Sequence, residues 1–433
     1  MDDREVIKAS DGGVENEIGV SGLKRTSHGV VQEEFIKELV GAKARRAYAR
    51  MEADPIVGAV LFAIEMLLRQ VPWRVERVSD APADVEAADF LESCMNDMSH
   101  TWASFIVEVL SMLPYGWALH EIVYKRRLGD DADSTKRSKY NDGRIGWRKL
   151  PLRGQETITS WLFDDNGGIT GARQRNPMNG AQVTLPIEKL LLFRTTERKN
   201  NPEGRSILRT AYWPWYRRTH AENIEAIGVE RDLAGLPVAE IPASYLAKNA
   251  SAEQKSMVTY MKGLITAIRR DEQEGVVWPL EYDDKGNKRF TLSLLTAGGK
   301  RQFDTDAIIL RYARWIAMTV LADFIMLGHE KVGSFALSND KTDLFGVALG
   351  AWLDSIQSVI NRFAVPRLFS LNAFAIEDTP MAMHGDVETP DLKALGDYIT
   401  AISGAGAPLF PNAELEAFLL DAAGLPSEQL SSV

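Results

Sequence analysis

The sequence predicts an α+β fold, and three observations support this prediction. Helical spacing and short β-rich runs are mixed along the stretch 33–195. A small region with both helix and strand patterns, 236–295, lies between two long helical segments. The segment 308–327, IILRYARWIAMTVLADFIML, reads as a helix that is apolar on almost every face. Such a helix must be covered on all sides.

The composition of the 433 residues, 45% hydrophobic and 25% charged, is that of a globular protein. The formal net charge is −10. Proteins that hold nucleic acid tightly are usually basic, so this charge disfavours stable DNA or RNA binding. The single cysteine, Cys94, excludes an intrachain disulfide and a cysteine-cluster zinc site. The charged start MDDREVIKAS lacks the apolar core of a signal peptide, so we expect a cytoplasm-like, reducing environment.

In the first half of the chain, the polar residues 1–30 are expected to form a flexible N-terminal arm. Asp54 followed by Pro55 predicts a helix start, because proline suits the first turn. The charged segment 128–143 is expected to be an exposed loop tip. Apolar spacing predicts helices at 33–51, 55–70, 84–96 and 101–113. Strands are predicted at 71–78, 117–125, 145–151, 155–163, 169–175, 182–186 and 190–195.

In the second half, the polar segment ERKNNPEG (197–204) breaks the pattern. A helix is expected over 206–233, kinked or shifted at its start by Pro214. Ser251 with Gln254 is a capping-box pattern that predicts the start of another helix. The remaining predictions are strands at 236–242, 274–282 and 289–295, a loop at 328–340, a helix at 341–371 and short helices over 390–425.

The apolar helix over 308–327 has three interpretations. A membrane span needs about 20 apolar residues, but each charge near the bilayer centre would cost roughly 2.5–3.5 kcal/mol. An ordinary core helix inside one large subunit is the second interpretation. We favour the third, a helix that packs against other copies of the chain, because nearly all of its faces need cover. Its polar members are Arg311, Arg314, Thr319 and Asp323.

No catalytic, cofactor or metal site is predicted, so we do not expect an enzyme. His120-Glu121 begins the zinc-protease pattern, but Tyr124 stands where the second histidine belongs. The stretch AGGKRQ (297–302) lacks the first glycine and the Ser or Thr of a phosphate-binding loop. Paired aspartates beside Gly or Asn are typical of solvated turns.

Three stretches give the chain a resemblance to a known family. They are DPIVGAVLFAIEMLLRQVPWRVE (54–76), YGWALHEIVYK (115–125) and LLLFRTTERKNNPEGRSILRTAYWPWY (190–216). In these stretches and in the order of its elements, the chain resembles the portal proteins of tailed bacteriophages, nearest the Mu-like branch, over residues 33–425. The resemblance implies a portal fold with a wing, a two-helix stem, a small α+β clip, a long spine helix and a helical crown.

The same resemblance implies how the chain is divided. After the arm 1–30, the implied parts are the α+β wing 31–205, stem helix 1 at 206–232, the clip 233–300, stem helix 2 at 301–327, a tunnel loop 328–340, the wing spine helix and its return 341–389, and the crown with the C-terminal helices 390–433.

The resemblance also implies a function. Portal subunits form a ring, usually of twelve copies, at one capsid vertex, and double-stranded DNA passes through it without sequence specificity during packaging and ejection. The implied partners are other copies of the chain, the terminase large subunit, a head–tail adaptor and the major capsid protein, with no membrane. The implied location is the virion, after assembly in the bacterial host cytoplasm.

Two sets of residues are expected to carry this function. The DNA channel would be lined by the tunnel-loop residues His329, Lys331, Ser334, Asn339 and Lys341. The subunit interface of the stem would use Arg311, Tyr312, Trp315, Ile316, Val320 and Asp323. Two alternatives stay open: another structural phage head or neck protein, and a phage DNA-processing enzyme whose carboxylates converge only in the fold.

Overall fold

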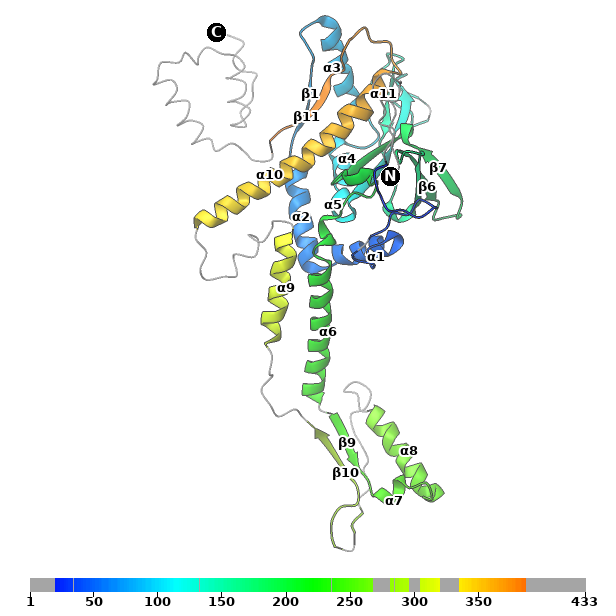
Figure 1. The fold of residues 1–433 in the computed structure, drawn as a ribbon, viewed down its shortest axis with the longest axis vertical. Helices are drawn as coiled ribbons and strands as arrows, with labels where there is room; N and C mark the ends of the chain where they lie inside the picture. Colours follow the sequence, from blue (N-terminus) through cyan, green and yellow to red (C-terminus); the bar gives the residue numbers. More distant parts are fainter. Residues whose placement is uncertain are drawn as a thin grey trace, which may run out of the picture. The chain divides into compact units, whose positions relative to one another are not determined.

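Figure 1 shows the computed structural model of the chain, which mixes helices with small antiparallel sheets, so the α+β prediction is confirmed. The chain divides into two compact units, the first comprising Met1–Ala211 with Ala317–Val433 and the second Tyr212–Ile316. The structure describes residues 20–33, 35–131, 133–234, 236–267, 281–283, 285–295, 304–319 and 335–386. The predicted crown and C-terminal helices (390–433) therefore lie outside the described residues.

Helices form much of the first unit. As predicted, α2 begins at Pro55, and Asp54 caps it by accepting hydrogen bonds from the N–H groups of Ile56 (3.0 Å) and Val57 (3.2 Å). The helix predicted over 33–51 begins only at Gly41, after an extended Val40. The helices are α1 (Gly41–Glu52), α2 (Pro55–Arg69), α3 (Pro82–Asn96), α4 (Trp102–Val109) and α5 (Met112–Tyr115).

The predicted arm 1–30 is shorter than expected at its C-terminal end. Arg25 forms an isolated antiparallel bridge with Val31, whose side chain is buried. Residues 20–30 therefore belong to the folded part of the first unit, and 1–19 lie outside the described residues.

The strands of the first unit pair antiparallel. The single strand predicted over 117–125 is two strands, because the chain changes partner at Ile122. The pairs are β1 (Trp73–Glu76) with β11 (Met381–His384), β2 (Trp117–Glu121) with β8 (Leu190–Arg194), and β3 (Val123–Arg126) with β4 (Ile145–Lys149). A three-stranded sheet contains β5 (Ile158–Phe163), β6 (Ile169–Arg175) and β7 (Gln182–Pro186). Single 3-10 turns occur at Gln155–Thr157, Ile187–Lys189, Arg198–Asn200 and Ile207–Arg209.

The β2–β8 pair separates two hydrophobic cores, because side chains alternate between the faces of a strand. One face belongs to the smaller core, which includes Trp161 of the three-stranded sheet, and contributes Trp117, Leu119, Leu190 and Leu192. The other face contributes Ala118, Leu191 and Phe193 to the larger core. The larger core also takes buried side chains from α2, α3, α4 and the long helix described next.

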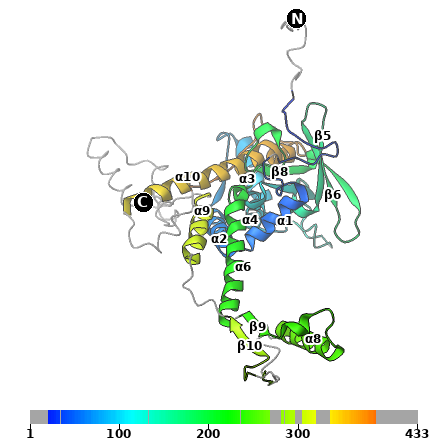
Figure 2. The same ribbon diagram turned by 60° about the horizontal axis from the view of Figure 1, so that its bottom comes forward.

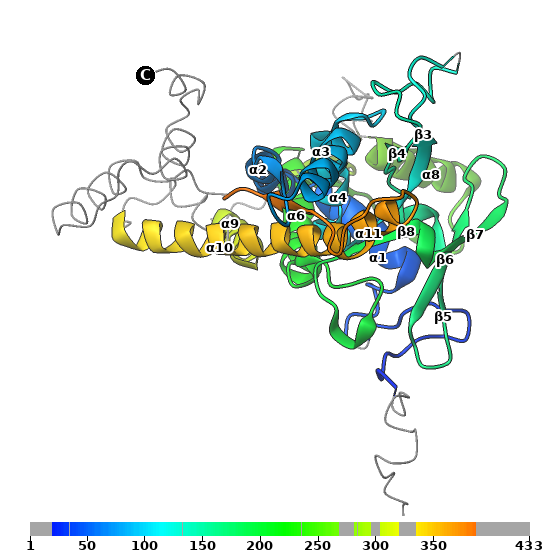
Figure 3. The same ribbon diagram turned by 90° about the horizontal axis from the view of Figure 1, so that it is seen from above.

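A long helix crosses the larger core. α10 (Phe335–Val359) continues through a π-helical turn (Ile360–Ala364) into α11 (Val365–Phe369), and Figure 3 shows the three segments as one rod. The π turn precedes Pro366, which lacks an N–H group and crowds the carbonyl group four residues earlier. The prediction began this helix at Lys341. α10 can start before Lys341 because the Ser, Asn and Asp residues that precede it each reduce the stability of a helix by only up to about 0.7 kcal/mol relative to alanine.

The rod holds the strand β11 through polar side chains. The amide of Asn361 donates to the carbonyl of Ala382 (2.9 Å) and accepts from its N–H (2.8 Å). Gln357 accepts a hydrogen bond from the N–H of His384 (3.0 Å). Because β11 pairs with β1, these bonds join the rod to the N-terminal part of the first unit.

The segment 128–143, predicted as an exposed loop tip, has no helix or strand in its described residues, but its base is anchored. Asp97 pairs with Lys125 (2.9 Å), and both side chains are 4% exposed. Asp97 also accepts hydrogen bonds from the hydroxyl of Ser138 (2.6 Å) and the N–H of Lys139 (2.8 Å). Burial alone would raise the pKa of Asp97, but the hydrogen bonds outweigh burial and hold the pKa below its ordinary value.

The second unit begins with α6 (Tyr212–Ala234) and continues with β9 (Leu236–Glu240), α7 (Ala243–Leu246), α8 (Ala252–Ala267), β10 (Thr291–Leu295) and most of α9 (Thr305–Thr319). The predicted capping box is confirmed, since Ser251 accepts from the N–H of Gln254 (3.2 Å) and Gln254 accepts from the N–H of Ser251 (2.9 Å). Figure 2 shows α8 beside the paired strands β9 and β10.

The strands predicted over 274–282 and 289–295 were expected to pair with each other, but the second of them has a different partner. β10 pairs with β9, and Tyr282 forms only an isolated bridge with Lys288. The N–H of Asp283 donates to the carbonyl of Asn287 (2.8 Å), which closes a turn between Tyr282 and Lys288. Residues 274–280 lie outside the described residues.

His120 is a fully buried titratable group in the wall of the larger core. Its Nδ1 donates a hydrogen bond to the carbonyl of Leu150 (2.7 Å). The rings of Phe105 and Phe193 pack edge-on against it, with centroids 5.1 and 5.5 Å away. Burial lowers the pKa of His120 to about 4. The native state therefore keeps this imidazole neutral at pH values where the unfolded chain protonates it.

The pKa of His120 is near 6.5 in the unfolded chain and about 4 in the native state. We expect the protein to lose stability as the pH falls from about 6.5 toward 4, because in this range the unfolded chain binds a proton at His120 and the native state does not. At about pH 4.5 this one residue should lower the free energy of unfolding by about 2–3 kcal/mol. His120→Gln keeps a donor for Leu150 without titrating. Urea midpoints at neutral pH and about pH 4.5 should therefore differ less in this variant than in the wild type.

The matched control for this measurement is His28→Gln, because His28 is exposed. This control should keep the pH dependence of the wild type. An unchanged pH dependence in His120→Gln would show that the buried imidazole does not govern acid stability.

Candidate functional site

The second unit carries the two long helices expected from the sequence. α9 lies beside α6, and the hydroxyl of Thr305 donates a hydrogen bond to Glu225 (Figures 1 and 2). α6 begins at Tyr212 instead of residue 206, so Pro214 falls in its first turn. Proline is tolerated there because its missing N–H would have no intrahelical partner. The expected shift of the helix start by Pro214 is thus confirmed.

An apolar stripe on α6 is exposed in the single chain. Trp213, Tyr216, Ile224 and Ile227 are 41, 50, 56 and 48% exposed, and His220 lies between them on the same helix face. Large apolar side chains gathered in a row at such exposure are typical of a surface that a partner covers. We call these four residues and His220 the α6 stripe.

The expected interface residues on α9 fall into three groups. Arg311, Tyr312 and Trp315 lie together: the guanidinium carbon of Arg311 is 5.2 and 5.7 Å from the two ring centroids, and Trp315 is 43% exposed. Ile316 is only 2% exposed, and a side chain already covered adds little area to a further contact. Val320 and Asp323 lie outside the described residues.

The expected tunnel-loop residues are mostly beyond the described part of the chain. His329, Lys331 and Ser334 lie outside the described residues. Asn339 and Lys341 lie on α10, not in a loop, and their side chains are likewise outside the description. The loop predicted over 328–340 therefore ends before Phe335, because Ser, Asn and Asp are tolerated in the first turns of α10.

Two kinds of site do not occur in the described ranges. No three His, Cys, Asp or Glu side chains in them gather as a metal ion would require. No helix within the same ranges combines the length and apolar character needed to cross a bilayer.

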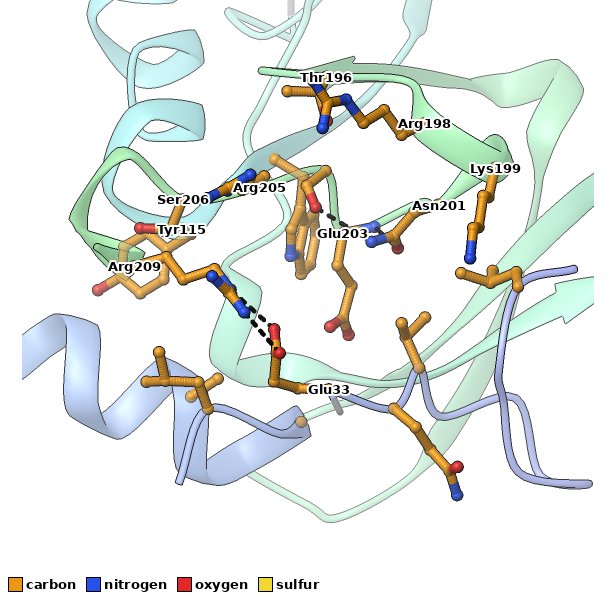
Figure 4. Close-up of a pocket in the computed structure, with 18 of the residues that line it drawn as sticks. Glu33, Tyr115, Thr196, Arg198, Lys199, Asn201, Glu203, Arg205, Ser206 and Arg209 are labelled. Carbon is orange, nitrogen blue, oxygen red and sulfur yellow. Dashed lines mark hydrogen bonds and ion pairs between the residues drawn. The ribbon is translucent and has the colours of Figure 1, made fainter. Parts of the chain in front are cut away.

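A charged pocket of about 400 Å³ lies in the first unit (Figure 4). Parts of the segment 23–48, Tyr115, Trp117 and the loop 196–209 line it. Within it, Arg209 donates two hydrogen bonds to the carboxylate of Glu33, at 2.8 and 2.6 Å. The bonds from Arg209 hold the pKa of Glu33 below its ordinary value. Such a two-bonded pair fixes the geometry of both side chains.

Glu203 and Arg45 form a second, looser pair in the pocket, with 3.8 Å between nitrogen and oxygen. The indole N–H of Trp161 donates to the same carboxylate oxygen (3.3 Å). Burial raises the pKa of Glu203 although Arg45 opposes this shift, and burial lowers the pKa of Arg45. Arg45 thus keeps guanidinium N–H groups that a further anion in the pocket would satisfy.

The loop 195–206 reaches the pocket from the end of β8 and packs closely on the start of β2. A Cβ atom on Gly204 would lie 2.2 Å from the carbonyl oxygen of Gly116, so this position accepts only glycine. Thr195 joins the two segments: its N–H donates to the carbonyl of Gly116 (3.1 Å) and its hydroxyl to that of Arg205 (2.6 Å).

The middle of this loop is strained. Lys199 and Asn200 have φ angles of 56° and 51°, which cost non-glycine residues on the order of 1–3 kcal/mol each. Arg194 supports this conformation by donating to the side-chain oxygen of Asn200 (3.2 Å) and the carbonyl of Asn201 (3.3 Å). From its sequence, the segment 197–204 was expected only to break the pattern of helices and strands. The sequence signal for a cationic loop with special backbone conformations is the gathering of Arg, Lys, Asn and Gly in ERKNNPEGR.

Comparisons with known proteins identify a family and solved structures with a similar fold. The family model described as the portal protein of Mu bacteriophage matches residues 45–418. A chain from the neck of an empty gene transfer agent (GTA) particle, computed with C6 symmetry, has a TM-score of 0.51 at 12% identity, over 94% of this chain and 97% of that one. A chain from the neck of a native GTA particle, computed with C12 symmetry, has a TM-score of 0.50 with the same identity and coverage.

At 12% identity the structural matches show a shared fold, whereas the family model spans most of the sequence. The chain therefore belongs to the family of the portal protein of Mu bacteriophage and is a portal, or head–tail connector, subunit, which is a structural phage protein and not an enzyme.

Proposed function

We propose that twelve copies of this chain form a ring at one capsid vertex, through which double-stranded DNA is packaged and ejected. The observation that carries the proposal is the α6 stripe, because large exposed apolar side chains in a row are typical of an interaction surface. The exposed group of Arg311, Tyr312 and Trp315 on α9 gives each subunit a second surface of mixed charge and aromatic character. Two different patches on one subunit suit head-to-tail contacts, which close into rings. The C12 symmetry used for the native GTA neck supports the number twelve.

In this proposal α6 and α9 are the stem, and the module of β9, β10, α7 and α8 is the clip. The α+β part of the first unit is the wing, with α10 and α11 as its spine. The boundaries expected from the resemblance are 31–205 for the wing, 206–232 and 301–327 for the stem and 233–300 for the clip. The change of unit after Ala211 supports the expected end of the wing, whereas the change after Ile316 lies within the expected second stem helix.

The net charge suits a channel that DNA crosses without being held. Twelve copies would carry a formal charge of about −120, and tight binding of DNA requires cations that displace its counterions. We assign the tunnel to residues 328–334 together with the start of α10, where Lys331 and Lys341 would touch the DNA backbone without reading its sequence.

The ring docks the terminase large subunit, a head–tail adaptor and the major capsid protein, and it is assembled in the bacterial host cytoplasm before residing in the virion. The family match supports these partners as a group, because each meets a portal ring at the vertex.

We expect Ile224→Asp with Ile227→Asp to lower the fraction of protein in rings at least about tenfold, because a carboxylate buried at an interface without a partner costs several kcal/mol. Negative-stain images and mass photometry of the purified protein would measure the fraction of rings. Ala226→Asp is the matched control, because Ala226 is exposed on the same helix about 100° away from the α6 stripe. Equal ring formation by the double variant and the control would remove the α6 stripe from the interface.

We expect Lys331→Glu with Lys341→Glu to reduce the DNA retained per particle while leaving rings intact, because the reversed charges would repel the passing backbone. Quantitative PCR of nuclease-protected DNA measures retention, and electron microscopy measures the rings. The control is Lys331→Arg with Lys341→Arg, which keeps both charges and should package normally. Normal packaging by the Glu variant as well would contradict the tunnel assignment.

A further inference from the structure

The charged pocket holds more positive charge than its own carboxylates neutralise. Glu33 is matched by Arg209, and Glu203 by Arg45. Three further cations line the pocket from the loop 196–206, and none of their side chains has a hydrogen-bond or ion-pair partner among the described residues. They are Arg198, Lys199 and Arg205, which Figure 4 shows around Glu203 and Asn201. Neighbouring cations without counter-charges repel one another, so this arrangement favours an anionic occupant.

The loop that carries these cations is built before any occupant arrives. The strained residue Lys199 is itself one of the three, and Arg194 supports the strained turn from the end of β8. Strain retained in a well-supported loop is typical of binding positions. A loop already held in shape also loses little conformational entropy when it binds.

We propose that the pocket binds the acidic N-terminal segment of the same chain, residues 1–19. This segment carries six carboxylates, Asp2, Asp3, Glu5, Asp11, Glu15 and Glu17, against two basic side chains, Arg4 and Lys8. Leu23 already lines the pocket, and the five residues between it and Glu17 allow these two residues to lie up to about 20 Å apart. The short tether keeps the segment at a high local concentration beside the three cations.

The carboxylates inside the pocket argue for a peptide and against nucleic acid. Glu33 and Glu203 would repel a continuous phosphate backbone, whereas a peptide of mixed charge can place Arg4 or Lys8 near them. The proposal concerns the first unit alone, so it does not depend on ring assembly.

Carbodiimide coupling of the full-length protein tests the proposal directly, because it joins carboxylates to amines that are in contact. Lys199 should couple to carboxylates of residues 1–19, and peptide mass spectrometry would identify the joined pairs. Arg198→Glu with Arg205→Glu keeps Lys199 but reverses its neighbours, and the coupling yield should fall at least about tenfold. Salt at about 1 M should lower the wild-type yield as well, because it screens charges beyond roughly 3 Å.

The matched control reverses two exposed cations on α8, Lys255→Glu with Lys262→Glu, and it should leave the yield unchanged. Coupling in a mixture of isotopically light and heavy chains should join peptides of one label. Three results would each overturn the proposal: no coupling of Lys199 to residues 1–19, the same yield in the Arg198 and Arg205 variant as in the wild type, or joined peptides that mainly combine the two labels. Protection of Lys199 by short duplex DNA in place of the segment would assign the pocket to nucleic acid.

Discussion

The antiparallel pairing of β2 with β8 is the constraint on which most of the first unit depends. Its two faces serve two cores, so neither core can form without this pair of strands. The register Trp117↔Arg194 also brings Gly116 against the loop that follows β8. The same ladder therefore fixes the hydrophobic interior and presents the cations of Arg198, Lys199 and Arg205 at the pocket.

Local signals in the sequence predicted local structure well. The cap at Asp54, the capping box at Ser251 and the strands β6 and β7 all occur where the pattern placed them, because each depends on residues within a few positions. Partner choice was not predicted. β1 pairs with β11 across about 300 residues, and such pairing depends on which surfaces meet in space, which no local pattern encodes.

Among the functional surfaces, too, one was predicted from the sequence and two were not. The all-round apolar helix predicted that something outside the chain must cover it, and the exposed Trp315 fits that inference. The α6 stripe was missed because its helix is amphipathic only weakly and its apolar members are separated by charged residues. The pocket was missed for a different reason: its walls come from three separate parts of the chain, 23–48, 115–117 and 196–209.

Net charge alone is a poor guide to what such a chain touches. A formal charge of −10 sets the field that passing DNA would meet at a distance, and that field disfavours tight capture. Over a few ångströms the neighbours of each side chain decide instead, and the loop 196–206 is locally cationic in an acidic protein. The surplus of carboxylates in residues 1–19 is then both part of this average and the anion that we propose for this loop. A portal subunit can thus repel DNA through its net charge and still bind an acidic segment of its own chain through a local group of cations.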